Sequence, residues 1–222
     1  MQEKKYNKIL TIVLVIVAIL ILVIFGFWFY DIYKRYYVKK EANEATEEFG
    51  YAVNQNQGFS TSNFVGNVSL EINDIVTNST VSDSRLAKVT YKGFTVVGRI
   101  EIPKIKLNYP VLDQATKASM EVSVGVVYGP GLNKVGNTVI MGHNYRNGTF
   151  FSDLKNLSNG DIVYITDLSG KKVKYTIYNI YQTTDSDFDY ATRETNGKKE
   201  ISLSTCTDDV KARLILWARE AE

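Results

Sequence analysis

The sequence has few of the cysteine and histidine residues that disulfides, zinc sites and most other metal sites require. Its 222 residues include one cysteine and one histidine. A single cysteine excludes an intramolecular disulfide framework and any zinc site built from several thiolates. A single histidine removes most of the remaining metal-binding combinations. We therefore expect no metal and no other cofactor.

Proline is also rare, and no basic surface is evident. Three prolines and 15 glycines argue against a collagen-like or low-complexity chain, and 45% apolar with 23% charged residues is typical of a globular protein. The formal net charge is +2, but from Glu41 onward 19 Lys and Arg stand against 22 Asp and Glu. The folded part therefore lacks the positive charge that nucleic-acid binding requires.

One long run carries no charge at all, from Ile9 to Tyr30. As a helix it would measure about 33 Å, which is enough to cross the hydrocarbon core of a bilayer. A cleaved signal peptide is the alternative, but the run is longer than an h-region and no small-x-small cleavage site follows it. We predict a transmembrane signal-anchor helix over residues 9–30, after a short tail at 1–8.

The rest of the chain divides by composition. Residues 31–50 are charged and rich in Ala and Glu, which predicts a helical stalk, and the polar residues that follow predict a linker or an N-terminal arm. We assign 31–90 to this stalk and arm and 91–222 to the folded domain. Within that domain we predict strands near Thr95–Ile102, Leu107–Leu112, Thr138–Met141, Asp161–Thr166, Lys172–Thr183, Glu200–Ser204 and Arg213–Ala218. One or two helical turns are expected in residues 149–156. Many short strands at this spacing indicate a β-barrel or a β-sandwich.

Cys206 ends one of these strands. The residues ISLSTC alternate between apolar and polar side chains as a strand does, and TDD after them reads as a turn. A lone cysteine is usually a small buried hydrophobe. A thiol at a strand end is instead held by a rigid element and reachable by substrate. Cys206 is therefore our candidate nucleophile.

His143 occupies a similar position at the end of the apolar strand TVIM. A lone histidine is more often a hydrogen-bonded surface or core residue. Pairing with histidine is, however, a recurrent way to activate a cysteine thiol. His143 is therefore the candidate acid/base partner of Cys206.

The sequence around these two residues closely resembles the sortases, a family of cysteine transpeptidases. The family's signature is a TLxTC strand end, and residues 202–206 read SLSTC, with serine in place of the first threonine. The GHN at 142–144 is followed by NGTFFSDL, and VGRIEIPKIKLNYPVL at 97–112 is similar to the family's opening strands. The resemblance covers residues 94–219, and a membrane anchor fits it.

The resemblance implies an all-β fold with minor α: a closed β-barrel of about eight strands with short helices, carrying three catalytic residues in one groove. It implies cleavage of an LPXTG-like sorting signal through a thioester on Cys206. The acyl group would pass to an amine of a cell-wall precursor or to a pilin lysine. The implied partners are surface proteins or pilins that bear the signal. The tail at 1–8 would be cytoplasmic and the catalytic domain extracellular, on a Gram-positive cell membrane.

The resemblance also implies a third catalytic residue, an arginine on the last strand. Arg213 matches it by position, and Arg219 is a rival because both lie on one face of the strand. The alternative role for Arg213 is structural, as the partner of Asp208 or Asp209 in a salt bridge. These two acids could also orient His143. Because acids in turns are more often solvated, we leave both out of the site. Thr205, next to the nucleophile, is expected to contact substrate.

The subclass is open at this stage. GHNYRNGTFFSDL and LSTCTDD look most like class B sortases, yet residues 185–199 are too few for the helical insertion usual there. Residues 31–93 contain no proline, so the lid of class C pilus polymerases is not evident. We predict a class B-like or intermediate enzyme with an open groove. The alternatives are a membrane-tethered cysteine hydrolase and a non-enzymatic surface scaffold.

Overall fold

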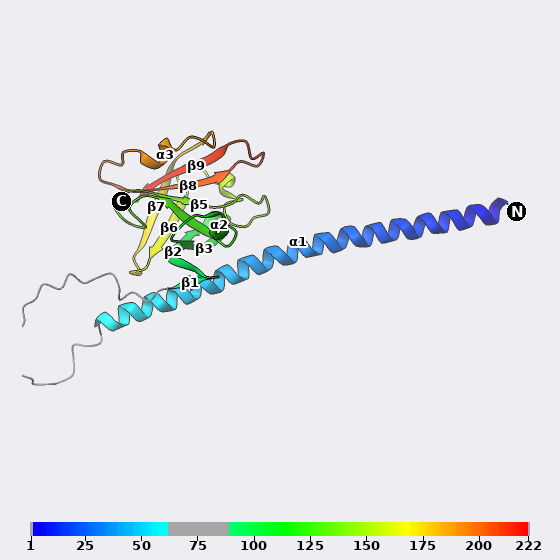
Figure 1. Ribbon diagram of the computed structural model, residues 1–222, viewed down its shortest axis with the longest axis horizontal. Coiled ribbons are helices and arrows are strands. Elements are labelled where there is room, and N and C mark those ends of the chain that lie inside the picture. Colours follow the sequence, from blue (N-terminus) through cyan, green and yellow to red (C-terminus); the bar gives the residue numbers. More distant parts are fainter. Residues whose placement is uncertain (1, 62–88, 222) are drawn as a thin grey trace, which may run out of the picture. The chain divides into compact units, whose positions relative to one another are not determined.

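A long N-terminal helix precedes a β-domain (Figure 1). The computed structural model describes the backbone of residues 2–61 and 89–221, and the side chains of residues 10–54 and 89–221. The helix, α1, runs from Gln2 to Thr61 and so continues past the stalk expected at 31–50. Residues 62–88, which the sequence assigns to the arm, lie outside the described part.

The part of α1 from Leu10 to Tyr30 is apolar on every side. All large apolar side chains from Leu10 to Tyr30 are exposed. Within the described residues, α1 is the one helix that is long and apolar enough to cross a membrane. A helix that offers apolar surface all round suits lipid and not water. Its length and composition thus agree with the predicted anchor.

The strands of the β-domain form one sheet that closes on itself. Its order is β1-β2-β3-β4-β5-β8-β9-β7-β6, and β2 also pairs with β6, so that eight strands form a closed barrel and β1 adds to the edge of β2. The fold predicted from the resemblance, a closed barrel of about eight strands, is confirmed. The strands are β1 Thr90–Tyr91, β2 Phe94–Ile102, β3 Leu107–Leu112, β4 Val124–Tyr128, β5 Gly136–Met141, β6 Ile162–Asp167, β7 Lys172–Thr183, β8 Lys199–Cys206 and β9 Arg213–Glu220.

Alternation along the strands builds the barrel core. In β2 the even-numbered residues from 96 to 102 are buried and the residues between them are partly exposed. Successive side chains of a strand point to opposite faces, so one set lines the interior. In β8 both sets are buried up to Thr205. The reason is that β8 has a second layer on its outer face, where the loop between β7 and β8 packs.

Most predicted strands coincide with observed ones within two residues, and the missed elements have local causes. β4 was not predicted, because Gly125 weakens a strand signal; a Cβ there would lie 2.8 Å from the carbonyl oxygen of Gln114. The helical turns expected at 149–156 shrink to the 3₁₀-helix η3, Leu154–Asn156. Two further short helices are α2, Lys117–Met120, and α3, Asp189–Thr192, and a 3₁₀-helix, η2, spans Pro103–Ile105.

The last third of α1, from Glu41, packs against the barrel. Asn108 on β3 donates hydrogen bonds to Asn43 at 3.2 Å and to Thr46 at 3.1 Å. Phe49 and Val53 join the core cluster of Val96 and Leu112. The buried residues of this stretch share one helix face at intervals of three and four: Ala42, Ala45, Thr46, Phe49 and Val53. This segment therefore covers the β2–β3 side of the barrel.

A buried carboxylate secures the opposite side, where the loop between β7 and β8 folds back over the sheet. The side chain of Glu200 is 0% exposed. It accepts hydrogen bonds from Arg193, from Arg219 at 2.6 Å and from Tyr178 at 2.7 Å. Burial by itself would raise the pKa of Glu200, but these donors together hold the pKa below its ordinary value. Because Arg193 belongs to the loop, the ionised carboxylate fastens the loop to β8 and β9.

Replacing this carboxylate should destabilise the fold. Glu200→Gln is expected to lower the free energy of unfolding by about 3 kcal/mol at pH 7, because Arg193 is left buried without its counter-charge. The folded-state pKa of Glu200 is depressed, so its contribution is present above the ordinary carboxyl range and is lost as the pH falls through the folded value. The difference in the free energy of unfolding between the parent and the variant should therefore become smaller below about pH 4.

Urea unfolding at several pH values, followed by tryptophan fluorescence, measures this difference. The matched control is Glu101→Gln, since Glu101 makes an ion pair with Lys172 but its side chain is 25% exposed. Glu101→Gln should lower the free energy of unfolding by less than about 1 kcal/mol. Equal losses for both variants would contradict a special role for Glu200.

Candidate active site

The candidate site lies where three neighbouring strands, β5, β8 and β9, end or begin. β5 and β8 are parallel and in register, with Met141 opposite Ser204. The backbone N–H of Gly142 still donates to the carbonyl oxygen of Ser204 at 3.2 Å, which extends the pairing past the end of β5. Continuing this register places His143 beside Cys206. The two singleton residues thus lie at one edge of the sheet.

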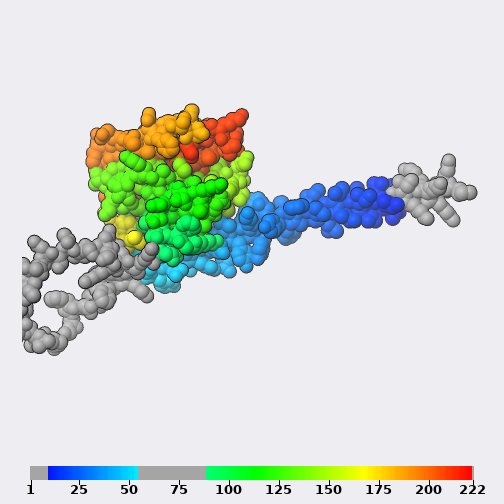
Figure 2. Space-filling view, viewed as in Figure 1, coloured from blue at the N-terminus to red at the C-terminus, as the bar shows by residue number. Residues whose placement is uncertain are grey.

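Arg213 completes the row from the other side. β9 is antiparallel to β8, and Arg213, its first residue, is the register partner of Cys206. Residues that are directly opposite in a sheet point to the same face. His143, Cys206 and Arg213 therefore lie in one row, on the outer face of β5, β8 and β9. In Figure 2 the C-terminal part of the chain, in orange and red, gathers on one side of the barrel.

The Arg213 side chain runs across the end of β8. Its guanidinium lies 3.8 Å from the sulfur of Met141 on β5, and its Nε donates to the carbonyl oxygen of Asp185 at 3.5 Å. Because β8 lies between β9 and β5, a guanidinium that reaches Met141 passes beside Cys206. Among the described residues Arg213 has no carboxylate partner, so the salt bridge with Asp208 or Asp209 is not formed.

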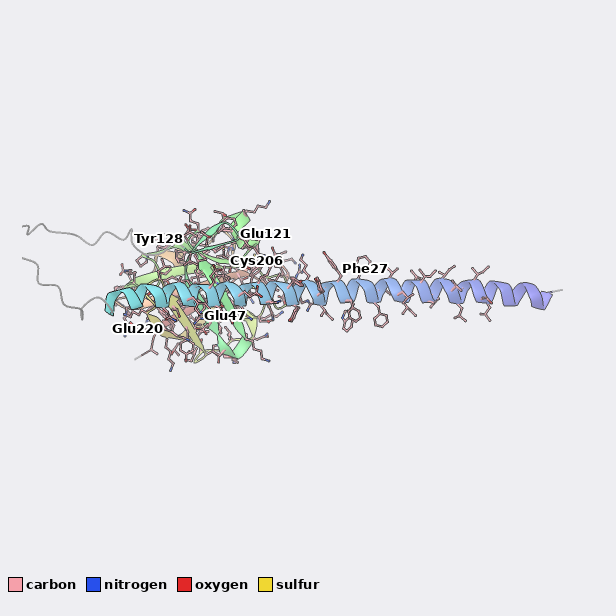
Figure 3. All side chains as sticks on the ribbon, turned by 90° about the horizontal axis from the view of Figure 1, so that it is seen from below. Phe27, Glu47, Glu121, Tyr128, Cys206 and Glu220 are labelled. Carbon is pink, nitrogen blue, oxygen red and sulfur yellow. The ribbon has the colours of Figure 1, made fainter. Side chains whose placement is uncertain are left out.

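Arg219, the rival to Arg213, is at the far end of the same strand. Its register partner is Glu200, to which it also donates a hydrogen bond. Figure 3 shows the neighbouring Glu220 well away from Cys206. Arg219 therefore belongs to the buried carboxylate cluster and not to the row of His143 and Cys206.

Thr205 ties the two strand ends together. It is 1% exposed, and its hydroxyl donates to the carbonyl oxygen of Gly142 at 2.8 Å. Gly142 is itself required by packing, since a Cβ there would lie 2.7 Å from Val124 Cγ1 and 3.1 Å from the ring of Phe151. The GHN and STC segments thus contact each other directly, one residue before His143 and Cys206.

Asn144 and Asp208 form a second link, which the sequence interpretation did not include in the site. Asn144 donates to the carbonyl oxygen of Cys206 and to the carboxylate of Asp208, both at 2.9 Å. Lys155 also binds Asp208, and Lys155 and Asn144 hold its pKa below the ordinary value. The only sequence signal for this link was proximity, one residue after His143 and two after Cys206. The turn after Cys206 is thereby fastened to the loop after His143.

A cavity of about 380 Å³ opens beside Cys206. It is lined by Asn144, Phe151, Ser152, Lys155, Ile180, Gln182, Leu214 and the segment 205–209. Thr205 and Leu214 are register partners whose side chains point inward, on the face opposite to that of Cys206 and Arg213. The cavity therefore reaches Cys206 from the end of the barrel, whereas His143 and Arg213 stand on the outer face.

Known proteins resemble this chain over the same region. The family model described as the sortase domain matches residues 100–221. A sortase A of Bacillus anthracis is 27% identical over 201 residues, covering 90% of this chain and 88% of the relative.

Solved structures of sortases are also similar to this chain. A lid mutant of sortase A from Corynebacterium diphtheriae has a TM-score of 0.52 at 28% identity, covering 57% of this chain and 70% of that one. Sortase C-1 from Actinomyces oris has a TM-score of 0.53 at 26% identity, covering 57% and 72%.

The hydrogen bond of Thr205 offers a direct test of how the strand ends are held. Thr205→Val keeps the shape of the side chain but leaves the Gly142 carbonyl without this donor, which should cost about 1–2 kcal/mol of stability. Turnover should also fall, because the positions of His143 and Cys206 loosen together. Thr205→Ser retains the hydroxyl and is the matched control. Thermal unfolding and steady-state kinetics measure the two effects, and a valine variant as active as the serine variant would contradict them.

Proposed function

Since this chain belongs to the sortase family of cysteine transpeptidases, we propose that it cleaves an LPXTG-like sorting signal through a thioester on Cys206 and transfers the acyl group to an amine. The observation that carries the proposal is the row of His143, Cys206 and Arg213 across three adjacent strands. A thiol, a proton donor and a fixed cation at one strand edge are the groups that acyl transfer requires.

In the first half-reaction the Sγ thiolate of Cys206 attacks the scissile carbonyl carbon. A C–S bond forms, and the carbonyl electron pair moves to the oxygen. Arg213 donates hydrogen bonds to this oxyanion, a role suited to a guanidinium because it stays charged and presents its donors in a rigid fork. The C–N bond then breaks, and the departing amine takes a proton from the His143 imidazolium, which leaves a thioester.

In the second half-reaction the acceptor amine attacks the thioester carbon. Its surplus proton passes to His143, the C–S bond breaks, and the thiolate of Cys206 is regenerated. The new amide joins the cleaved protein to the acceptor. Both the thiolate and the imidazolium are thus restored after each turnover, and no redox partner or metal is needed for the balance.

We still expect Thr205 to contact substrate, but not through its hydroxyl group. Because its hydroxyl is bonded to Gly142, the contact would be made by the parts of the residue that line the cavity beside Cys206. Its main contribution in this scheme is to hold His143 and Cys206 in register.

The proposed setting is the outer surface of a Gram-positive cell membrane. Residues 9–30 of α1 would cross the bilayer, with the tail at 1–8 in the cytoplasm and the stalk, arm and catalytic domain outside. The donors would be surface proteins or pilins that carry a C-terminal sorting signal. The acceptor would be an amine of a peptidoglycan precursor or a pilin lysine.

A class B-like or intermediate subclass remains our proposal. The segment between β7 and β8 contains only α3, a helix of four residues. This is shorter than the helical insertion that class B enzymes usually carry, which is why the intermediate form is included. The boundaries at residues 31–90 and 91–222 are retained with it.

Removing the thiol tests the covalent step. Cys206→Ala should abolish turnover of a fluorogenic LPXTG peptide and the acyl-enzyme mass shift on the protein. Its melting temperature should change by less than about 3 °C, since Cys206 is half-buried and its neighbours remain packed. A His143→Ala variant should lose most of the rate as well. Turnover by the alanine variant at Cys206 would refute the mechanism.

The products distinguish transpeptidation from the alternative, hydrolysis by water. With the parent protein we expect amide products when oligoglycine or a lysine-bearing peptide is supplied, at the expense of the free acid. Mass spectrometry of the reaction measures this ratio. Free acid alone at millimolar acceptor, with a normal rate of thioester formation, would favour the cysteine hydrolase.

The two arginines of β9 should behave differently. Arg213→Ala is expected to lower kcat by about 10²-fold or more, because the oxyanion loses its charged donor. Arg219→Ala should leave kcat within about threefold of the parent and lower the melting temperature instead, since it weakens the buried Glu200 cluster. Paired kinetics and thermal unfolding measure both variants. The reverse pattern would transfer the catalytic role to Arg219.

A further inference from the structure

Glu121 is a carboxylate beside the candidate acid/base residue that no sequence motif singled out. It is the residue that ends α2, and its Oε1 lies 3.6 Å from Nε2 of His143. Nε2 is shielded from solvent and makes no hydrogen bond within the described residues. The imidazole thus directs a buried nitrogen at an acidic side chain.

Tyr145 holds this carboxylate in place. Its hydroxyl donates a hydrogen bond to Oε2 of Glu121, and its ring lies against the His143 ring with centroids 5.0 Å apart. The backbone N–H of Tyr145 is fixed by Ser152 Oγ at 3.1 Å. Partial burial, and then the bond to Glu121, raise the pKa of the Tyr145 phenol, so it remains a donor across the working pH range. Glu121 keeps Oε1 for the imidazole.

The short helix α2, which directly precedes Glu121, is held by local hydrogen bonds. Thr116 and Ser119 form a capping box around the first turn of α2. The hydroxyl of Ser119, which is 1% exposed, also donates to the carbonyl oxygen of Gln114 at 2.6 Å. The main chain at Glu121 is therefore anchored, while its side chain is 59% exposed and can turn. A small rotation closes the 3.6 Å separation to a hydrogen bond, a tightening that is common when substrate binds.

We propose that Glu121 is a positioning residue for His143: it binds Nε2–H, fixes the orientation of the ring and leaves Nδ1 as the nitrogen that exchanges the proton. The inference rests on the proposed function, in which His143 gives a proton to the leaving amine and takes one from the incoming amine. A ring nitrogen is set as donor or acceptor by the bond that the other nitrogen makes. A buried N–H without an acceptor would cost about 1–3 kcal/mol, and Glu121 offers that acceptor.

The proton balance follows from this assignment. The imidazolium carries a proton on each nitrogen. Nδ1 gives its proton to the departing amine and becomes the acceptor for the proton of the next amine, while Nε2 keeps its proton bonded to Glu121 throughout. Glu121 only accepts the hydrogen bond from Nε2–H and takes no proton in the cycle. Tyr145 acts through Glu121 and likewise transfers no proton.

Because the chain has one histidine, its ¹⁵N imidazole spectrum comes from His143 alone. In alkaline buffer, at a pH where the ¹⁵N shifts themselves show a neutral ring, the parent chain in detergent should have Nε2 protonated and Nδ1 bare. Glu121→Ala should shift the spectrum toward a mixture of both tautomers. Glu121→Gln, which keeps an acceptor oxygen, should retain the Nε2–H form. A parent spectrum with the proton on Nδ1, or a spectrum unchanged in Glu121→Ala, would overturn the proposal.

Kinetics supply the second readout. Glu121→Ala should lower kcat by about 10-fold to 100-fold with KM within about twofold, as for other residues that orient a catalytic or metal-bound histidine. Glu121→Gln should recover part of the loss, and Tyr145→Phe should show a smaller fall because its ring still contacts His143. The matched control is Glu101→Gln, an ion-paired carboxylate on β2, which should keep the parent rate.

The two readouts keep this inference separate from the proposed function. The tautomer needs no substrate, so a parent chain that fails to turn over an LPXTG peptide would count against the proposed function and not against the contact. An active parent enzyme whose kcat survives Glu121→Ala would sink the positioning role alone. If Glu121→Ala loses its melting transition, Glu121→Leu takes its place, because it also removes the acceptor oxygen and is expected to show the same tautomer mixture and loss of kcat.

Discussion

The parallel pairing of β5 with β8 is the constraint on which the site depends. Parallel strands end at the same edge of a sheet, so the segments after Met141 and Ser204 emerge side by side. The antiparallel β9 begins at that same edge, with Arg213 opposite Cys206. A shift of one residue in either register would turn Cys206 away from the face of the sheet that Arg213 and the proposed acid/base residue share. The chemistry therefore rests on backbone hydrogen bonds that form far from any substrate.

Two sets of contacts stabilise these strand registers. At the strand ends, Thr205 binds the Gly142 carbonyl and Asn144 binds the Cys206 carbonyl, so each chemical motif holds the other. At the opposite end of β8, the buried Glu200 fixes Arg193 and with it the loop between β7 and β8. That loop begins at the site, where its Asp185 carbonyl accepts from Arg213. The loop therefore contacts residues near both ends of β8.

The same layout explains why the last third of α1 and the site do not compete for surface. β8 lies four strands away from β2 in either direction around the barrel, and the part of α1 from Glu41 packs where Val96 and Leu112 lie, on the β2–β3 side. The edge that carries Cys206 has a cavity beside it. A substrate can therefore reach this edge without displacing that part of α1.

Much of the fold and the core of the site could be read from local sequence. Alternation in segments such as KVKYTIYNIYQT marked the strands, an uncharged run marked the apolar helix, and SLSTC with GHN identified the family and its two singletons. Local sequence does not report which strands become neighbours. It left the choice between Arg213 and Arg219 to resemblance, missed β4 because of Gly125, and gave no sign of Glu121. The sequence by itself determined the elements and the reactive groups, since these depend on residue type and short-range spacing. Only the tertiary structure decided which groups meet, because the contacts of His143 with Glu121, of Asn144 with Cys206 and of Arg219 with Glu200 join segments that are distant in the chain.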